Sequence, residues 1–242
     1  MSEYNKTQLT PQKSFERHVY HRDMFAHYLR WSHILKCVKP HQMILDFGCG
    51  SGEMYQLLYH NRHTPELYVG LDIRERTIEK NKSMFTKNCL FEAVDLCKPF
   101  DLGMTFDVIT CFEVLEHIGH KNIDAILQNM VRHADENTQI FISTPNCDPS
   151  VGAAENHILG PDREIGEWDH YELQDKLSEY FVIEKKYGTF ASIKDYQDKM
   201  NDWQRKMYNT LSEYYDTTLL SVIMAPMFPD DARNTLWVLR KK

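Results

Sequence analysis

The sequence lacks several features that would point to a membrane or an oxidising compartment. Its longest apolar stretch, residues 219–228, is interrupted by Ser221 and Pro226, and it is far shorter than the roughly 20 residues that span a bilayer. The N-terminal residues carry no apolar signal core, so we expect no export, no membrane span and a cytoplasmic location. The six cysteines include no C-x-x-C pair, which indicates neither a zinc site nor a disulfide framework.

Broad basic charge is also lacking over most of the chain. The 242 residues have a formal net charge of -7, yet residues 1–41 hold seven Lys or Arg against three acids, and the remainder holds 21 against 32. An acidic body argues against a sequence-independent nucleic-acid clamp, which needs a wide basic face. The length suits one large domain. We therefore predict a helical N-terminal cap over residues 1–41 and one domain over residues 42–242.

Strands alternate with helices through the first half of the chain. Short apolar runs predict strands near residues 43–45, 67–71, 89–94, 106–111 and 139–143. Apolar residues on one helical face predict helices over residues 14–38, 53–60, 77–85 and 121–134. This alternation predicts an α/β fold with a doubly wound, mostly parallel sheet.

The second half of the chain is less regular. A loop over residues 146–166 precedes a predicted helix at 170–177 and a strand at 181–187, and residues 234–239 predict a last strand. Between these strands, apolar residues at steps of three and four predict one long amphipathic helix from Ile193 to Leu211, within a helical insertion at about residues 191–231. We interpret its apolar face as packing against the sheet, with a substrate lid as the alternative.

The most informative stretch is Asp46-Phe47-Gly48-Cys49-Gly50-Ser51-Gly52, which joins the first predicted strand to a helix. Glycines let the backbone approach a ligand closely, and open α/β sheets bind ligands at the carboxyl ends of their strands. The dinucleotide fingerprint G-x-G-x-x-G fails here, because Glu53 stands at the last glycine position. A negative side chain at the helix start also suits a pyrophosphate poorly. The loop therefore favours a cofactor without phosphate.

This stretch resembles the first motif, acid-x-Gly-x-Gly-x-Gly, of the class I S-adenosylmethionine-dependent methyltransferases. The resemblance covers about residues 42–146 well and the rest loosely. It implies a seven-stranded sheet with the last strand antiparallel, and S-adenosyl-L-methionine as cofactor. It also implies that Asp72 binds the ribose hydroxyls and Asp95 the adenine amino group. The residues that it assigns to the cofactor are Asp46, Gly48, Cys49, Gly50, Gly52, Asp72, Ile73, Asp95, Leu96, Cys111, Phe112 and Glu113.

Two alternatives accompany this interpretation. Asp46 either contacts the amino and carboxylate end of the cofactor or caps the start of the helix that follows the glycine turn. The whole fold could also be a similar α/β fold with an unused or different nucleotide pocket. A non-catalytic binding protein on a degenerate methyltransferase fold is the corresponding functional alternative.

The residues after the fourth predicted strand narrow the choice of methyl acceptor. Methyltransferases of exocyclic DNA amines carry Asp/Asn-Pro-Pro-Tyr there, whereas this chain has Cys111-Phe112-Glu113-Val114. Cytosine-C5 enzymes use a cysteine that follows a proline, and none of the six cysteines does. Both reactions are therefore disfavoured.

The segment Glu113-Val114-Leu115-Glu116-His117 resembles the E-x-x-E-H motif of bacterial small-RNA 2′-O-methyltransferases, in which it holds a divalent metal together with a later histidine. Here residues 164–168 lack that histidine, and His157 or His170 could replace it only through a rearranged loop. Small-molecule methyltransferases, including the quinone O-methyltransferases, carry the same five residues. We therefore predict no metal, with His117 as the acid or base and Glu116 beside it. Alternatively, these two residues cap the next helix or line the acceptor site.

The basic N-terminal region supplies candidate acceptor contacts. Tyr20 and Arg22 precede the sheet where related enzymes fold a helix over the cofactor, and with His157 we predict that they bind substrate. Alternatively, these side chains only cover the surface. We expect methyl transfer to an oxygen or nitrogen of a small molecule. The alternative is ribose 2′-O-methylation of RNA or a nucleotide at a metal-assisted site. The oligomeric state is open.

Overall fold

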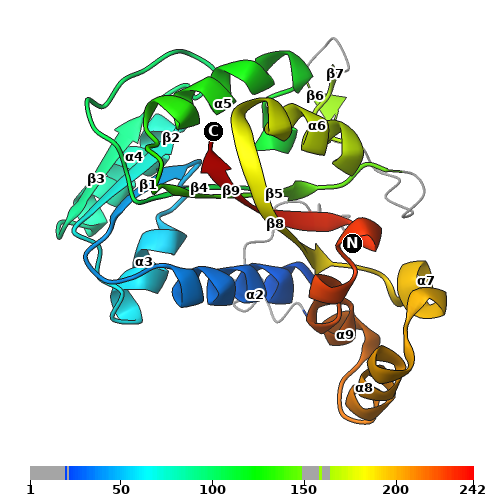
Figure 1. Ribbon diagram of the computed structural model, residues 1–242. Helices are drawn as coiled ribbons and strands as arrows, with labels where there is room; N and C mark the ends of the chain where they lie inside the picture. Colours follow the sequence, from blue (N-terminus) through cyan, green and yellow to red (C-terminus); the bar gives the residue numbers. More distant parts are fainter. Residues whose placement is uncertain (1–19, 21, 149–157, 160–163) are drawn as a thin grey trace, which may run out of the picture.

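The computed structural model describes residues 20, 22–148, 158–159 and 164–242. Its centre is a seven-stranded sheet with the strand order β3-β2-β1-β4-β5-β9-β8 (Figure 1). The strands are β1 (Met43–Phe47), β2 (Leu67–Asp72), β3 (Cys89–Ala93), β4 (Val108–Phe112), β5 (Gln139–Pro145), β8 (Phe181–Phe190) and β9 (Asn234–Lys241). Only β9 runs antiparallel to its neighbours β5 and β8. The predicted doubly wound sheet with an antiparallel last strand is confirmed.

Helices cover both faces of this sheet. One face carries α2 (Arg22–Cys37), α3 (Glu53–His60) and α4 (Glu75–Met84), and the other carries α5 (Ile123–Arg132) and α6 (His170–Tyr180) (Figure 1). Neighbouring residues of one strand enter different cores, since Ile44 packs with the first group of helices and Leu45 with the second. This is the period of two expected for a strand buried on both faces.

Helix α2 is packed on the sheet along its length. Ile34 is fully buried in the same cluster as Ile44 of β1, and the helix ends at Cys37, before Pro40. The predicted residues 14–19 of this helix lie outside the described part of the chain. The division of the chain at residue 41 stays a prediction. A short pair of strands, β6 (Ile158–Leu159) and β7 (Glu164–Ile165), lies within the predicted loop.

The predicted single helix from Ile193 to Leu211 is wrong. The chain instead forms α7 (Ile193–Tyr196), a 3₁₀ turn, α8 (Asp202–Ser212) and α9 (Thr217–Ile223). The break has a local cause, because Asn201 begins a new helix. Its side chain accepts a hydrogen bond from the Gln204 amide at 2.9 Å, and its own backbone amide donates to the Gln204 side-chain oxygen at 2.9 Å. Such a capping box competes with continuation of the preceding helix.

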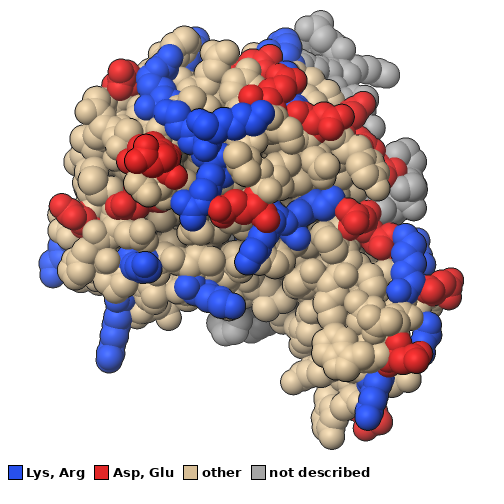
Figure 2. Space-filling view, in the orientation of Figure 1, with Lys and Arg blue, Asp and Glu red and all other residues tan. Residues whose placement is uncertain are grey.

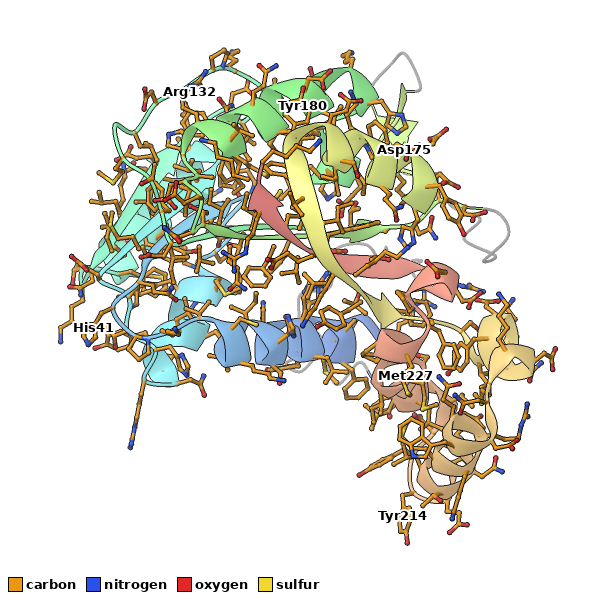
Figure 3. All side chains as sticks on the ribbon, viewed as in Figure 1. His41, Arg132, Asp175, Tyr180, Tyr214 and Met227 are labelled. Atoms are coloured by element: carbon orange, nitrogen blue, oxygen red, sulfur yellow. The ribbon has the colours of Figure 1, made fainter. Side chains whose placement is uncertain are left out.

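The insertion contacts β8 through α9 and the turns that follow it, whereas the apolar face predicted from Ile193 to Leu211 does not lie on the sheet as predicted. Its apolar residues form a separate cluster, in which the rings of Tyr196 and Phe228 stack at 4.3 Å. Figure 2 shows the insertion as a lobe at the lower right, and Figure 3 shows Tyr214 at its outer tip. Met227 lies where the lobe joins the body of the molecule. No helix of the described residues is long and apolar enough to cross a membrane.

Candidate active site

The glycine loop lies between β1 and α3, at the carboxyl edge of the sheet, and two of its glycines serve different purposes. Gly48 has a φ of +78°, and a Cβ there would lie 2.3 Å from Cγ2 of Val114, so this glycine is required for packing. Gly50 has a φ of +55°, and its Cβ would face the Glu53 carboxylate at 3.1 Å and the Arg74 guanidinium at 3.7 Å. Because Gly50 has no side chain, the side of the loop that faces Glu53 and Arg74 stays accessible to a ligand.

Asp72 stands at the end of β2, as predicted, and its carboxylate faces this loop. It accepts hydrogen bonds from the Gly50 amide at 3.1 Å and from the backbone and side chain of Arg74 at 2.9–3.0 Å. Burial on its own raises the pKa of Asp72, but the bonds and charge of Arg74 outweigh it and hold that pKa below the usual value. The site thus contains an ionised carboxylate. The Arg74 side chain is 61% exposed.

The residues that follow β2 and β3 differ in accessibility. Ile73 is 66% exposed although it is apolar, and it follows Asp72 directly in the sequence. Asp95 is half-buried. Its carboxylate accepts a hydrogen bond from the Cys97 amide at 3.0 Å and lies 3.3 Å from Nζ of Lys98. Leu96 is buried in the main core. Ile73 and Asp95 are therefore the side chains of this group that a ligand could reach.

Asp46 is directed into the protein. Its carboxylate accepts hydrogen bonds from the Tyr68 hydroxyl at 2.5 Å and from the Thr110 hydroxyl at 2.7 Å, and the residue is only 5% exposed. Burial raises the pKa of Asp46 to about 6, against the opposing effect of these bonds. Asp46 does not cap α3, because the residue at the helix start is Gly52, which makes no side-chain cap. The capping alternative is therefore wrong, and contact with a cofactor stays a prediction.

Two cysteines predicted at the cofactor are buried. Cys111 is fully buried in the core beneath α5, and Cys49 is 4% exposed on the other side of the sheet. Burial is the main cause that raises the pKa of both thiols. Neither thiol is a nucleophile in this state, since reactivity requires the thiolate. Only their backbone atoms could line a cofactor site.

Glu113, directly after β4, is the centre of a polar network that joins three parts of the chain. It has a left-handed backbone, with a φ of +55°, and its carboxylate forms an ion pair with Arg30 of α2. The same carboxylate accepts hydrogen bonds from Ser143 of β5 at 2.9 Å and from Asn234 of β9 at 2.9 Å. Burial alone raises the pKa of Glu113, but the Arg30 charge and these bonds lower it below its usual value. Glu113 is therefore ionised.

The two predicted acid-base residues, in the turn after β4, differ in exposure. His117 is exposed, whereas Glu116 is 3% exposed and accepts a hydrogen bond from the Thr144 hydroxyl at 3.1 Å. Burial, followed by the negative charge of Glu113, raises the pKa of Glu116 well above its usual value. Burial therefore favours the protonated form of the Glu116 carboxyl. The catalytic roles of both residues stay predictions.

The E-x-x-E-H segment does not fit a metal site in this conformation. A divalent cation requires accessible oxygen ligands, yet the Glu113 carboxylate is engaged by Arg30, Ser143 and Asn234, and the Glu116 carboxyl is buried against Thr144. His170 lies apart, with its Nε2 at 2.6 Å from the Thr235 hydroxyl. Among the residues that the structure describes, no group of three or more metal-binding side chains occurs.

A pocket of about 330 Å³ lies where the N-terminal segment meets the insertion. Two predicted substrate residues line it: Tyr20, whose hydroxyl donates to Asp216 at 2.9 Å, and Arg22, whose guanidinium lies 4.3 Å from the centre of the Phe190 ring. His157 lies outside the described residues. The structure therefore brings Tyr20 and Arg22 together at one pocket, separate from the glycine loop.

Sequence reasoning missed the partners that hold the site. Arg30, Asn234 and Arg74 were not among its candidates, although each bonds a carboxylate that was. Asn234 lies 121 residues from Glu113, and Arg30 lies 83 residues away, so no local spacing connects them. Arg74 is only two residues from Asp72, and this short Asp-x-Arg spacing was the one available local signal.

A family model described as a methyltransferase domain matches residues 17–224. No curated protein matches the sequence. Solved structures do. A chain of the complex between the Haloferax volcanii Trm112 methyltransferase activator and the putative methyltransferase is 14% identical, with a TM-score of 0.62, and the match covers 96% of this chain and 93% of that one.

Two further solved structures have a similar fold. An S-adenosylmethionine-dependent methyltransferase from Mesorhizobium loti is 15% identical, with a TM-score of 0.59 and coverage of 91% of this chain and 100% of that one. The N-methyltransferase NodS from Bradyrhizobium japonicum is 14% identical, with a TM-score of 0.52 and coverage of 89% and 96%. At such identities the likeness shows the fold.

Proposed function

The chain belongs to the class I S-adenosylmethionine-dependent methyltransferases, and we propose that it transfers a methyl group to an oxygen or nitrogen of a small-molecule acceptor. The observation that carries this proposal is the ionised Asp72 carboxylate at the end of β2, facing the glycine loop. A carboxylate there is able to accept hydrogen bonds from two neighbouring hydroxyls.

The described residues fit S-adenosylmethionine as the methyl donor. Asp72 would hold its ribose hydroxyls, the exposed Ile73 would cover the adenine ring, and Asp95 would accept from the adenine amino group. Gly50 would let the donor approach the loop. When bound, the donor supplies a methyl group on a sulfonium, which an acceptor lone pair attacks in line.

Two features favour a small acceptor over an RNA end. Residues 42–242 hold 21 Lys or Arg against 32 acids, whereas a nucleic-acid surface needs an excess of clustered positive charge. The Glu113 carboxylate, which would be the first metal ligand of the RNA-type site, is bonded by Arg30. We therefore place ribose 2′-O-methylation second, and we derive no step through a metal.

His117 is our candidate for the group that accepts a proton from the acceptor. It is exposed at the turn after β4, within the segment that carries Glu113. A hydroxyl or ammonium acceptor must lose a proton, and an imidazole is the side chain that most often takes it near neutral pH. Glu116 is buried and bonded by the Thr144 hydroxyl, so we assign it to positioning this turn rather than to proton transfer.

Calorimetry tests donor binding. Titration with S-adenosylmethionine should give one site per chain with micromolar-range affinity, and Asp72→Ala should weaken it at least tenfold. Asp175→Ala, an exposed carboxylate on α6, is the matched control and should bind as the natural protein does. No binding to the natural protein would remove the enzyme proposal and favour the non-catalytic alternative.

Product analysis tests the acceptor class. A host extract incubated with the protein and methyl-labelled donor is divided by a small-molecule filter, and the labelled product is identified by mass spectrometry. Label in the filtrate, on oxygen or nitrogen, supports the proposal. Label that stays with RNA and becomes filterable after nuclease treatment contradicts it and favours the ribose alternative.

A further inference from the structure

Asn129 is a buried polar residue in an apolar stretch of α5. The helix buries Ile123, Ile126, Leu127 and Met130 in the main core, and Asn129 of the same helix is only 1% exposed. A buried side-chain amide destabilises a protein unless its donors and its acceptor are hydrogen-bonded. The position of Asn129 is therefore explained only by the groups that it bonds.

Those groups belong to the loop that follows β3. Nδ2 of Asn129 donates to the Leu96 carbonyl and to the Lys98 carbonyl, each at 2.9 Å. Its Oδ1 accepts hydrogen bonds from the Phe100 amide at 3.4 Å and from Nη1 of Arg132 at 3.0 Å. Both N–H groups and the oxygen of this side chain are thus in use. One side chain of α5 holds three alternate residues of the loop.

The two carbonyls bonded by Asn129 flank Cys97, whose amide holds Asp95. That amide donates to Oδ1 of Asp95 at 3.0 Å, and the Lys98 amide donates to the Asp95 carbonyl at 3.0 Å. The direction of the Asp95 carboxylate therefore depends on where residues 96–98 are held. Its Oδ2 lies 3.3 Å from Nζ of Lys98, whose side chain is 78% exposed, so water weakens this pair and a ligand can compete for the oxygen.

Asp95 lies close to the donor residues at the carboxyl edge of the sheet. Asp72 pairs with Ala93 in the parallel ladder of β2 and β3, and the Val94 amide donates to the Asp72 carbonyl at 3.0 Å. Asp95 is the next residue of the chain. The acid that we expect at the adenine thus follows a strand end that adjoins the acid that we expect at the ribose, as two parts of one nucleoside require.

The later part of the loop has separate anchors on α5. Nη1 of Arg132 donates to the Phe100 carbonyl at 2.7 Å, and Nε2 of His133 accepts a hydrogen bond from the Leu102 amide at 3.0 Å. These two side chains hold residues 100 and 102, whereas Asn129 holds residues 96 and 98. Asn129 is therefore the anchor on α5 that acts on the turn containing Asp95.

We propose that Asn129 is a positioning residue for the adenine end of the methyl donor, because it holds residues 96–98 so that the Asp95 carboxylate meets the adenine amino group. This inference rests on the proposed function and adds a determinant of donor specificity to it. A carboxylate accepts a hydrogen bond from that amino group, and it finds no donor on a purine that lacks it. Asn129 itself is buried and acts only through the loop.

The test compares the binding of S-adenosylhomocysteine with that of its deamino analogue, in which hydrogen replaces the adenine amino group. The natural protein should prefer S-adenosylhomocysteine by about tenfold or more in calorimetry, because the analogue loses a hydrogen bond to a charged group. Asp95→Ala should reduce this preference below about threefold, since that bond is then absent for both ligands. Asn129→Leu and the milder Asn129→Ser should lower the preference in the same direction.

Thr138→Val is the matched control for Asn129→Leu. Thr138 is fully buried just before β5, and its hydroxyl donates to the Phe106 carbonyl at 2.6 Å and accepts the Asp135 amide at 2.8 Å. The variant therefore also removes buried hydrogen bonds, but at the amino end of the strand. It should unfold at a lower urea concentration and keep the natural preference for adenine. An equal loss of preference in Thr138→Val would overturn the positioning role.

The double variant with Asp95→Ala and Asn129→Leu tests whether Asn129 acts through Asp95. It should show no smaller preference than Asp95→Ala alone. A further loss in the double variant, or a natural preference in Asn129→Leu, contradicts the inference and leaves the methyltransferase proposal standing. Equal binding of the two ligands to the natural protein does so too. Absence of binding of either ligand to the natural protein overturns the proposed function as well.

Hydrogen exchange supplies a measurement that needs no variant. With each ligand at saturation on the natural protein, S-adenosylhomocysteine should slow the exchange of amides in residues 96–102 more than the deamino analogue does. Equal protection of this segment by the two ligands would show that the loop held by Asn129 does not respond to the adenine amino group, and it would overturn the inference.

Discussion

Arg30 and Glu113 form an ion pair that fastens α2 to the end of β4. The Arg30 side chain is 2% exposed and that of Glu113 is 25% exposed. Arg30 also donates to the Ser143 hydroxyl at 2.8 Å, and that hydroxyl donates to Glu113 at 2.9 Å. The pKa of His27, beside Arg30, is lowered to about 3, first by burial and then by the Arg30 charge, so the neutral imidazole can accept a bond from the guanidinium.

Removing one partner of this pair should destabilise the protein strongly. Arg30→Met leaves the Glu113 carboxylate without its cation, and we expect a loss of about 3 kcal/mol in the free energy of unfolding. Adding Glu113→Gln to Arg30→Met should restore part of that loss, because the uncompensated charge is gone. Urea denaturation of the two single variants and the double variant measures the coupling.

The pair between Arg240 and Glu184 is the control for this prediction. Its side chains are 39% and 32% exposed, so water screens their attraction, and Arg240→Met should cost less than about 1 kcal/mol. Equal losses at Arg30 and Arg240 would mean that burial does not set the strength of the pair at Glu113.

The raised pKa of Glu116 should appear in the pH dependence of stability. The folded protein keeps this proton to a higher pH than the unfolded chain, in which the carboxyl titrates near about 4.3. The stability that Glu116 contributes is therefore fully present below that pH and declines as the pH rises toward the raised folded value. Glu116→Gln remains neutral at every pH, so it should become more stable relative to the natural protein as the pH rises.

Chemical denaturation between about pH 5 and about pH 8 measures this difference, which should grow by at most about 1.4 kcal/mol per pH unit. Glu136→Gln is a suitable control, because Glu136 is exposed on a turn. Parallel curves for the natural protein and Glu116→Gln would show that Glu116 does not hold a proton in the folded state.

The two glycines of the loop should respond differently to alanine. Gly48→Ala places a Cβ 2.3 Å from Val114 at a φ of +78°, so we expect a loss of stability that Val114→Ala partly reverses. Gly50→Ala meets only the flexible ends of Glu53 and Arg74, and its cost should be near the roughly 1–2 kcal/mol of a left-handed residue. Its main effect should be weaker donor binding.

Thermal denaturation and calorimetry with S-adenosylmethionine separate these two effects. If Gly50→Ala unfolds as readily as Gly48→Ala and the double variant with Val114→Ala shows no recovery, the assignment of packing to one glycine and of ligand access to the other is wrong.

Arg74 should compete with the donor for Asp72. Its side chain donates to both carboxylate oxygens, the atoms that the ribose hydroxyls would use. The guanidinium is 61% exposed, so releasing it costs little. Arg74→Ala should therefore bind S-adenosylmethionine as tightly as the natural protein or severalfold more tightly, opposite to Asp72→Ala. A tenfold weaker binding in Arg74→Ala would instead make the arginine part of the donor site.

Local pattern was enough to predict most of the sheet. Alternating burial of residues such as Ile44 and Leu45 is a property of the strand itself, so the apolar runs located β1 to β5 to within a few residues. The ends of parallel strands meet at one edge, which is why Asp72 and the glycine loop could be expected together. The prediction of one helix from Ile193 to Leu211 was wrong because the capping box at Asn201 starts a new helix, although the apolar spacing continues through it.

The sequence by itself determined most of the sheet, the glycine loop and the acid that ends β2, because each depends on residues close together in the chain. Only the tertiary structure decided that Glu113 is bonded by Arg30 and Asn234, that Glu116 is buried with a raised pKa, and that Tyr20 and Arg22 line one pocket with Phe190. Burial and long-range pairing set these states, and both arise only when α2, β8 and β9 are brought to the same edge of the sheet.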